Sequence, residues 1–204
     1  MSTIDYYYSV RSVYAYFGSR RIAALAKRFG RTLRHRPMDL SRVVPAAGSL
    51  PFAQRSATLR NYQFGRELER WSEWLELPVI VEPKHHYGDR DLPSGLILAA
   101  QKQGCDADAL SDAILTALWR DDRDIADRGV LTEIAASAGI DAAPLLERAL
   151  APDTMAEFAA CTDEAIRMGV LGSPTYGVDG ELFYGQDRLM FVERQLERPF
   201  KVAT

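Results

Sequence analysis

The feature that most limits the possible folds is the order of extended and helical patterns at the start of the chain. Residues 4–10, IDYYYSV, are aromatic and β-branched, which predicts a strand. Residues 14–29 then place apolar side chains at helical spacing, and residues 31–38 alternate as a second strand does. A β-α-β opening favours two parallel strands joined by a right-handed crossover.

The other end of the chain predicts a β-β-α unit. Residues 175–185 contain two short extended runs around a Val-Asp-Gly sequence at 178–180, which is a strong signal for a hairpin turn. Residues 186–196 then predict a final helix. Its apolar stripe consists of Leu189, Val192 and Leu196.

Between these ends, the sequence is mostly helical. Residues 39–52 predict a loop, 56–76 a long helix, 78–83 a short extended segment, and 94–168 a series of helices separated at Gly104, Gly129, Gly139 and Pro152. We therefore predict an α/β protein with a thioredoxin-like fold and a large all-helical insertion. Residues 1–38 plus 169–204 would form the thioredoxin-like domain, and residues 39–168 the insertion. The inward residues of the long helix would be Leu59, Leu68, Trp71 and Leu75, while Trp74 and Trp119 would be core or helix-packing residues.

Composition and charge exclude several classes of function. The 204 residues are 47% hydrophobic and carry a formal charge of −3, so the sequence predicts a folded protein with no nucleic-acid partner. No apolar run is long enough to cross a bilayer, and the N-terminus lacks a signal-peptide pattern, which predicts a cytoplasmic location with no membrane partner. Cys105 and Cys161 are far apart and the histidines are few, so no metal site is expected.

The first candidate for chemistry is Ser12, where the first strand gives way to a helix in the sequence Ser-Val-Tyr-Ala. A helix N-terminus offers unpaired N–H groups and positive dipole charge, which stabilise a nearby thiolate. A serine hydroxyl can donate a hydrogen bond to that anion. The alternative is that Ser12 only caps the helix.

The second candidate is the Ser173-Pro174 pair, which precedes the first strand of the hairpin. A proline at this place needs a special reason, and a cis peptide bond would be one. That bond would expose the backbone of Ser173 beside the Ser12 corner for pairing with a peptide-like ligand. An ordinary trans turn is the alternative, and the local sequence alone favours it.

The order of these motifs resembles that of a known family. The runs DYYYSVRSVYAYFG, DLSRV, ELERWSEWLELP, ALWRDDRDIAD and GVLGSPTYGVDGELFYGQDRL together resemble the 2-hydroxychromene-2-carboxylate isomerase family, from Ile4 to Leu196. That family is related to kappa-class glutathione transferases and, more distantly, to DsbA-like oxidoreductases. The resemblance implies a DsbA/kappa-type thioredoxin fold and a homodimer. The chain departs from the family pattern at Ser9, Val13 and Ala15.

The resemblance also implies roles for individual residues, with glutathione as the cofactor. Ser12 would face the glutathione sulfur, and Ser173 with a cis Pro174 would pair with its cysteinyl backbone. Arg55 would suit a substrate carboxylate, because its guanidinium binds such groups bidentately. The γ-glutamyl end would be held by Tyr184, Gly185, Gln186 and Asp187, and the substrate pocket would be lined by Gln54, Arg55 and His85.

With Ser12 and Ala15 in the positions of a C-x-x-C pair, this corner cannot form a disulfide. The expected function is therefore a glutathione-dependent isomerase of 2-hydroxychromene-2-carboxylate or a similar aromatic 2-oxo acid. It would work by reversible thiolate addition, bond rotation and elimination. Two alternatives stay open: a kappa-like glutathione transferase or peroxidase, and a non-catalytic thiol- or peptide-binding protein.

Overall fold

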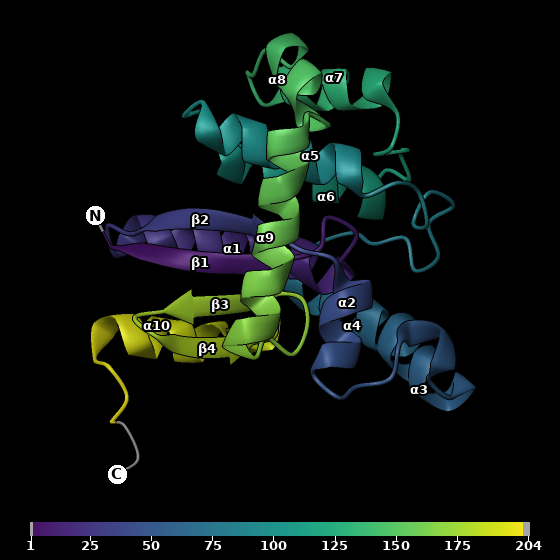
Figure 1. The fold of residues 1–204 in the computed structure, drawn as a ribbon. Coiled ribbons are helices and arrows are strands. Elements are labelled where there is room, and N and C mark those ends of the chain that lie inside the picture. Colours follow the sequence, from purple (N-terminus) through teal and green to yellow (C-terminus); the bar gives the residue numbers. More distant parts are fainter. Residues whose placement is uncertain (1, 202–204) are drawn as a thin grey trace.

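The computed structural model describes residues 2–201, in which four strands form one mixed sheet (Figure 1). The strand order is β2-β1-β3-β4, with β1 parallel to β2 and antiparallel to β3. The predicted β-α-β opening and the hairpin around Asp179 and Gly180 are both confirmed. The strands are β1 (Thr3–Tyr8), β2 (Thr32–Pro37), β3 (Thr175–Val178) and β4 (Glu181–Tyr184).

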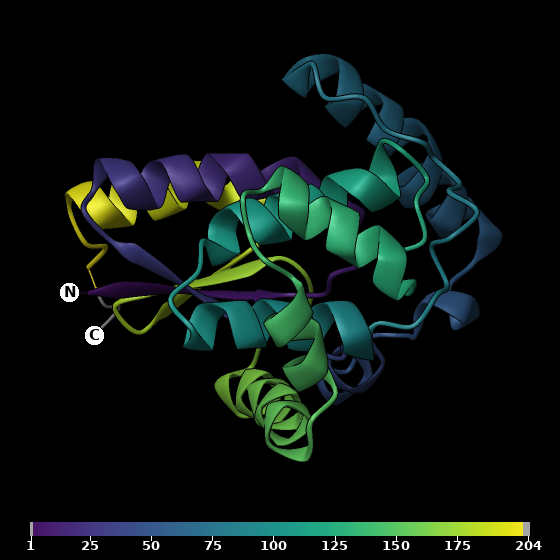
Figure 2. The same ribbon diagram turned by 90° about the horizontal axis from the view of Figure 1, so that it is seen from above.

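Helices cover both faces of this sheet, as Figure 2 shows with the strands edge-on. On one face lie α1 (Val13–Arg28) and α10 (Leu189–Glu197), the helices that the two ends of the sequence predict. On the other face lie α5 (Asp91–Lys102) and α9 (Pro152–Met168). The fold is thus the thioredoxin-like α/β arrangement expected from the sequence, with α1 beginning directly after β1.

The helix-rich middle of the chain is also confirmed. Besides α5 and α9 it contains α6 (Ala107–Trp119), α7 (Arg128–Ser137) and α8 (Ala143–Ala149). One predicted break is wrong, because Gly129 lies in the first turn of α7, where Asp127 caps the helix by accepting from the N–H of Val130 at 2.8 Å. Within the described residues, no helix is long and apolar enough to cross a membrane.

The segment between β2 and α5 differs most from the prediction. The expected loop at 39–52 contains a helix, because Asp39 caps it by accepting from the N–H of Ser41 at 2.8 Å. The expected single helix at 56–76 is divided by a π-helical turn. In order, the elements are α2 (Leu40–Ala46), η1 (Phe52–Gln54), α3 (Ala57–Asn61), η2 (Tyr62–Arg66) and α4 (Glu67–Leu75).

The π turn changes which side chains of this segment face inward. Leu68 is fully buried, but Leu59 is 41% exposed and Trp74 is 80% exposed, so the prediction is wrong for both. A π turn contains more residues than an α turn, and it therefore shifts the helical phase on its two sides. Trp71 and Leu75 are partly buried against the core, while Trp119 is 1% exposed, as expected.

A single large apolar core joins the sheet to the helical segment. In the sheet, the rings of Tyr6 and Tyr8 stack with centroids 4.1 Å apart, and Tyr176 stacks on Tyr6 at 5.6 Å. The same core includes Leu96 of α5 and Leu118 of α6, both fully buried. The division into residues 1–38 plus 169–204 and residues 39–168 stays a prediction. That division assigns α9 to the insertion, and Figure 1 shows that α9 lies across the sheet.

Candidate active site

The centre of the site is the corner between β1 and α1. Ser12 is the N-cap of α1, and its Oγ accepts a hydrogen bond from the backbone N–H of Ala15 at 3.2 Å. The same hydroxyl donates to the carbonyl oxygen of Ser173 at 3.4 Å, which is a long and weak hydrogen bond. The Ser12 hydroxyl therefore both caps α1 and contacts the second motif, and its own proton is in a weak hydrogen bond.

The second motif lies directly against this corner. The Ser173-Pro174 peptide bond is cis, as the resemblance implies, so the trans turn favoured by the local sequence is wrong. The preference of an X-Pro bond for the trans form is small in a short peptide, so the surrounding fold can override it. The backbone N–H of Ser9 donates to Ser173 Oγ at 3.0 Å. Two motifs that are far apart in the sequence thus meet through Ser9, Ser12 and Ser173.

The segment from Tyr184 to Asp187 continues from the same place. The N–H of Gly185 donates to the carbonyl of Pro174 at 2.9 Å, which ties this segment to the cis proline. Gln186 is buried, and its Oε1 accepts from Arg21 Nη1 at 2.6 Å. Asp187 forms an ion pair with Arg188 and keeps a 41% exposed side chain. Asp187 is therefore open to a ligand, whereas Gln186 is held by Arg21 through Oε1 and its buried Nε2 has no hydrogen-bond partner among the described residues.

The residues expected to line the substrate pocket lie in two places. Gln54 is in η1 and Arg55 follows it; Arg55 donates from Nε to the carbonyl of Leu50 and from Nη1 to Gln63 Oε1, both at 3.2 Å. The carbonyl of Gln63 in turn lies 2.7 Å from the hydroxyl of Tyr14, in the first turn of α1. The structure therefore connects Arg55 to the corner through Gln63.

His85 lies elsewhere, in the segment between α4 and α5. Its Nδ1 is 3.7 Å from Asp124 Oδ2, and its backbone N–H donates to Asp122 Oδ1 at 3.2 Å. The neighbouring His86 packs its ring on Trp119 with centroids 4.8 Å apart. Burial lowers the pKa of His86, and the charge of Arg11 lowers it further. Of the two histidines, His86 is the one near the corner residue Arg11.

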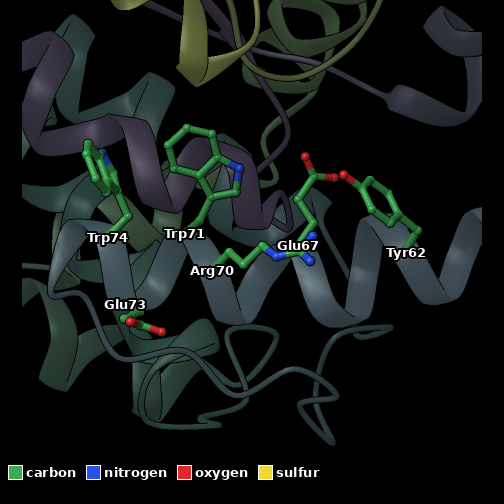
Figure 3. Close-up of a pocket in the computed structure, with 6 residues that line it drawn as sticks. All are labelled: Tyr62, Glu67, Arg70, Trp71, Glu73 and Trp74. Carbon is green, nitrogen blue, oxygen red and sulfur yellow. The ribbon is translucent and has the colours of Figure 1, made fainter.

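A cavity of about 580 Å³ opens along η2 and α4 (Figure 3). Figure 3 shows the rings of Trp71 and Trp74 on one side of α4, with the Glu67 carboxylate directed toward Tyr62. The Tyr14 hydroxyl, in the first turn of α1, donates to Glu67 Oε2 at 3.1 Å, so one residue that lines the cavity also contacts α1. Burial and the Glu67 carboxylate raise the pKa of Tyr14 far above its ordinary value, which keeps this phenol protonated.

Sequence reasoning did not find several of these residues. Tyr14 and Arg11 are next to the serine motif, but no local pattern indicates what their side chains contact. Glu67 and His86 come from segments whose position depends on the π turn and on a segment without regular structure. Only the folded chain brings Glu67 and His86 to the corner. In the residues that the structure describes, no group of three or more His, Cys, Asp or Glu side chains could hold a metal ion.

Comparison with known proteins identifies the family. The family model described as a DSBA-like thioredoxin domain matches residues 3–197. The chain belongs to this family. In this DSBA-like protein, the corner that begins α1 carries Ser12 and Ala15 in place of a cysteine pair, and its cysteines are elsewhere. Both are free; Cys161 is buried, which raises the pKa of its thiol, and Cys105 is half-buried.

Individual relatives confirm the resemblance found in the sequence. A protein of Sphingobium xenophagum named 2-hydroxychromene-2-carboxylate isomerase is 29% identical over 194 residues, which cover 95% of this chain and 97% of the relative. A solved structure of such an isomerase superposes with a TM-score of 0.79 at 22% identity, over 96% of this chain and 95% of that one. The cytosolic disulfide reductase DsbM of Pseudomonas aeruginosa, solved with GSH, gives 0.67 at 22% identity, over 97% and 93%. At these identities the two structures show a shared fold.

Proposed function

We propose that this protein is a glutathione-dependent isomerase of 2-hydroxychromene-2-carboxylate or a similar aromatic 2-oxo acid. The observation that carries the proposal is the Ser12 hydroxyl, seated at the N-terminus of α1 and 3.4 Å from the backbone of Ser173. The name of the Sphingobium relative, which matches nearly the full chain, supports the reaction. In the cell we expect a cytoplasmic homodimer, and sedimentation of the purified protein tests the dimer.

The groups around the corner fit glutathione chemically. The Ser12 hydroxyl and the free N–H groups of the first turn of α1 suit a thiolate. The backbone of Ser173 suits the peptide portion, and the exposed carboxylate of Asp187 suits the ammonium of the γ-glutamyl end. The DsbM structure, which shares the fold and was solved with GSH, supports such a site on this scaffold.

In this mechanism, the protein stabilises the thiolate form of glutathione and positions the substrate. When bound, glutathione supplies a nucleophilic sulfur that adds reversibly to a conjugated carbon, and this addition allows bond rotation before elimination. Ser12 turns its weakly held proton from the Ser173 carbonyl toward the sulfur. A hydrogen bond to a charged group is worth about 1.5–3 kcal/mol, or roughly one to two pKa units. Arg55 and the aromatic cavity beside Tyr14 hold the substrate.

The first test is the variant Ser12→Ala. We expect it to bind glutathione, to raise the pKa of the bound thiol by roughly one to two units, and to lose most turnover. Thiolate absorbance as a function of pH and an isomerisation assay measure the two effects. Asp127→Ala is the matched control, because it also removes a helix cap, but on α7. Turnover of Ser12→Ala equal to that of the unmodified protein would remove Ser12 from the mechanism.

The reaction class has its own test. An isomerase returns each glutathione, so the concentration of free thiol stays constant while the substrate is consumed. A stoichiometric loss of free thiol would contradict the proposal and indicate a transferase. Calorimetry without any heat of glutathione binding would contradict the cofactor.

A further inference from the structure

Arg11 occupies the turn immediately before Ser12. Its backbone N–H donates to Ser9 Oγ at 3.3 Å, and its Nη1 donates to the carbonyl of Gly88 at 2.9 Å. Gly88 belongs to the segment between α4 and α5, which is joined to β1 and α1 by this contact. The Arg11 side chain therefore extends from the proposed reaction centre to the segment that carries His86.

The charge of Arg11 has no counter-ion in residues 2–201, although the side chain is half-buried. The nearby carboxylates are engaged elsewhere. Asp39 Oδ2 accepts from Arg90 Nη2 at 2.6 Å, and its Oδ1 caps α2. The oxygens of Asp89 accept from backbone N–H groups at the start of α5. Asp91 lies 3.7 Å from Arg90 Nε.

The remaining donors of Arg11 are available to a ligand. In the described part of the chain, its Nε and Nη2 have no hydrogen-bond acceptor, and neither is among the buried unpaired atoms, whereas Nε of Arg90 is. Burial lowers the pKa of the Arg11 guanidinium, and the charge of Arg90 lowers it further. An arginine nevertheless stays protonated, so the fold keeps a partly desolvated cation that an anion would stabilise.

We propose that Arg11 binds a carboxylate of the reacting complex through the free edge of its guanidinium. This inference rests on the proposed function, in which a thiolate approaches a substrate that is itself an anion. A guanidinium next to Ser12 offsets the repulsion between these two charges. Two sources share this chemistry: the carboxylate of the 2-oxo-acid substrate and the glycyl end of glutathione. Arg55, by comparison, already donates to Leu50 and Gln63.

The variant Arg11→Met tests this proposal in the full-length protein. It keeps an unbranched apolar stem of similar width and removes the guanidinium with its charge. Arg148→Met is the matched control, because Arg148 is an exposed arginine of α8 whose partner is Asp153. If the substrate is the source, we expect KM to rise roughly 10- to 100-fold with a smaller change in kcat, and glutathione to bind as before.

Calorimetry distinguishes the two sources and also a purely structural role. If the glycyl end is the source, Arg11→Met weakens glutathione binding roughly 10- to 100-fold. An analogue whose glycyl carboxylate is an amide then binds both proteins equally. If the substrate carboxylate is the source, phenylpyruvate and its amide are compared as competitive inhibitors of Arg11→Met and of the unmodified protein. A loss of affinity confined to the carboxylate ligand supports the proposal. A misfolded corner would instead weaken binding of the carboxylate and the amide alike.

The outcomes separate the two proposals. Equal KM and equal glutathione affinity in Arg11→Met and the unmodified protein overturn the role of Arg11 and leave the isomerase intact. Equal weakening of the carboxylate and amide ligands also overturns it, since the residue is then structural. If the unmodified protein binds neither glutathione nor phenylpyruvate, the proposed function fails together with this inference.

Discussion

At the scale of single residues, the corner combines a hydroxyl at a helix N-terminus with a guanidinium that has no counter-ion among residues 2–201. Ser12 both caps α1 and meets the backbone of Ser173, while Arg11 beside it reaches Gly88. His86 lies beside Arg11 and packs its ring on Trp119. Its pKa is lowered mainly by burial and further by the charge of Arg11. A neutral imidazole next to a guanidinium leaves the cationic charge of the corner on Arg11.

The lowered pKa of His86 predicts how stability changes with pH. The folded protein resists protonation of this ring, whereas the unfolded chain binds the proton at about pH 6.5. The free energy of unfolding should therefore fall as pH drops through about 6.5 toward the lower pKa of the folded state. In His86→Gln this part of the slope should disappear.

Urea unfolding of both proteins between about pH 7.5 and about pH 5.5 measures the effect, in a range above the titration of ordinary carboxylates. The comparison of the two slopes isolates His86, because the other histidines are present in both proteins. Parallel slopes would show that this ring takes up its proton equally well in the folded state.

At the scale of elements, the contact between α5 and α8 depends on the absence of a side chain at Gly95. A Cβ at this position would overlap the carbonyl oxygen of Ala149, the last residue of α8, and would lie 2.9 Å from Met155 Cε. Backbone atoms cannot move aside as the end of a flexible side chain can. The close approach of these two helices therefore requires glycine.

Gly95→Ala should lower the free energy of unfolding by about 1–3 kcal/mol, because overpacking outweighs the better helix propensity of alanine. Gly65→Ala is the control, since nothing lies within 4 Å of a Cβ at that position in η2. Its stability should stay unchanged or rise by up to about 1 kcal/mol. Denaturant titration measures both variants. Equal stability of the Gly95 variant and the unmodified protein would mean that α8 can shift without cost.

The elements also show how far the sequence could lead. The β-α-β and β-β-α ends were predictable, because their periodicities and the Asp179-Gly180 turn are local signals. The helix α2 was not, because Pro45 and Gly48 suggested a loop and the capping role of Asp39 was not recognised. For the site, the sequence placed Ser173 beside Ser12 only if the Ser173-Pro174 bond is cis, and the family resemblance, not the local sequence, favoured the cis form. The contact of Tyr14 with Glu67 could not be predicted, since it depends on the phase shift at the π turn.

At the scale of the whole molecule, the sheet and the helical segment share one core, although sequence patterns suggest two parts. The core cluster joins Tyr6 and Tyr176 of the sheet to Leu96, Leu118 and Trp119 of the helices. Apolar burial shared in this way couples the stability of both parts. The molecule should therefore behave as one cooperative unit.

The chain provides two optical signals that report on the two parts to different degrees. All three tryptophans, Trp71, Trp74 and Trp119, lie in residues 39–168, while the stacked Tyr6, Tyr8 and Tyr176 lie in the sheet. We expect tryptophan fluorescence and near-ultraviolet circular dichroism of the tyrosines to give the same unfolding midpoint. A calorimetric enthalpy equal to the van't Hoff enthalpy would agree. Two separate midpoints would show that the insertion unfolds by itself.

The hydroxyl at the start of α1 has a consequence for how the protein responds to oxidants. A cysteine pair at this position would switch between two covalent states and would need a partner to reset it. Ser12 and Ala15 have no such second state, and the free thiols of Cys105 and Cys161 belong to other segments. Under oxidative stress the corner itself therefore stays chemically unchanged, and under the proposed function turnover would follow the supply of reduced thiol in the surrounding solution.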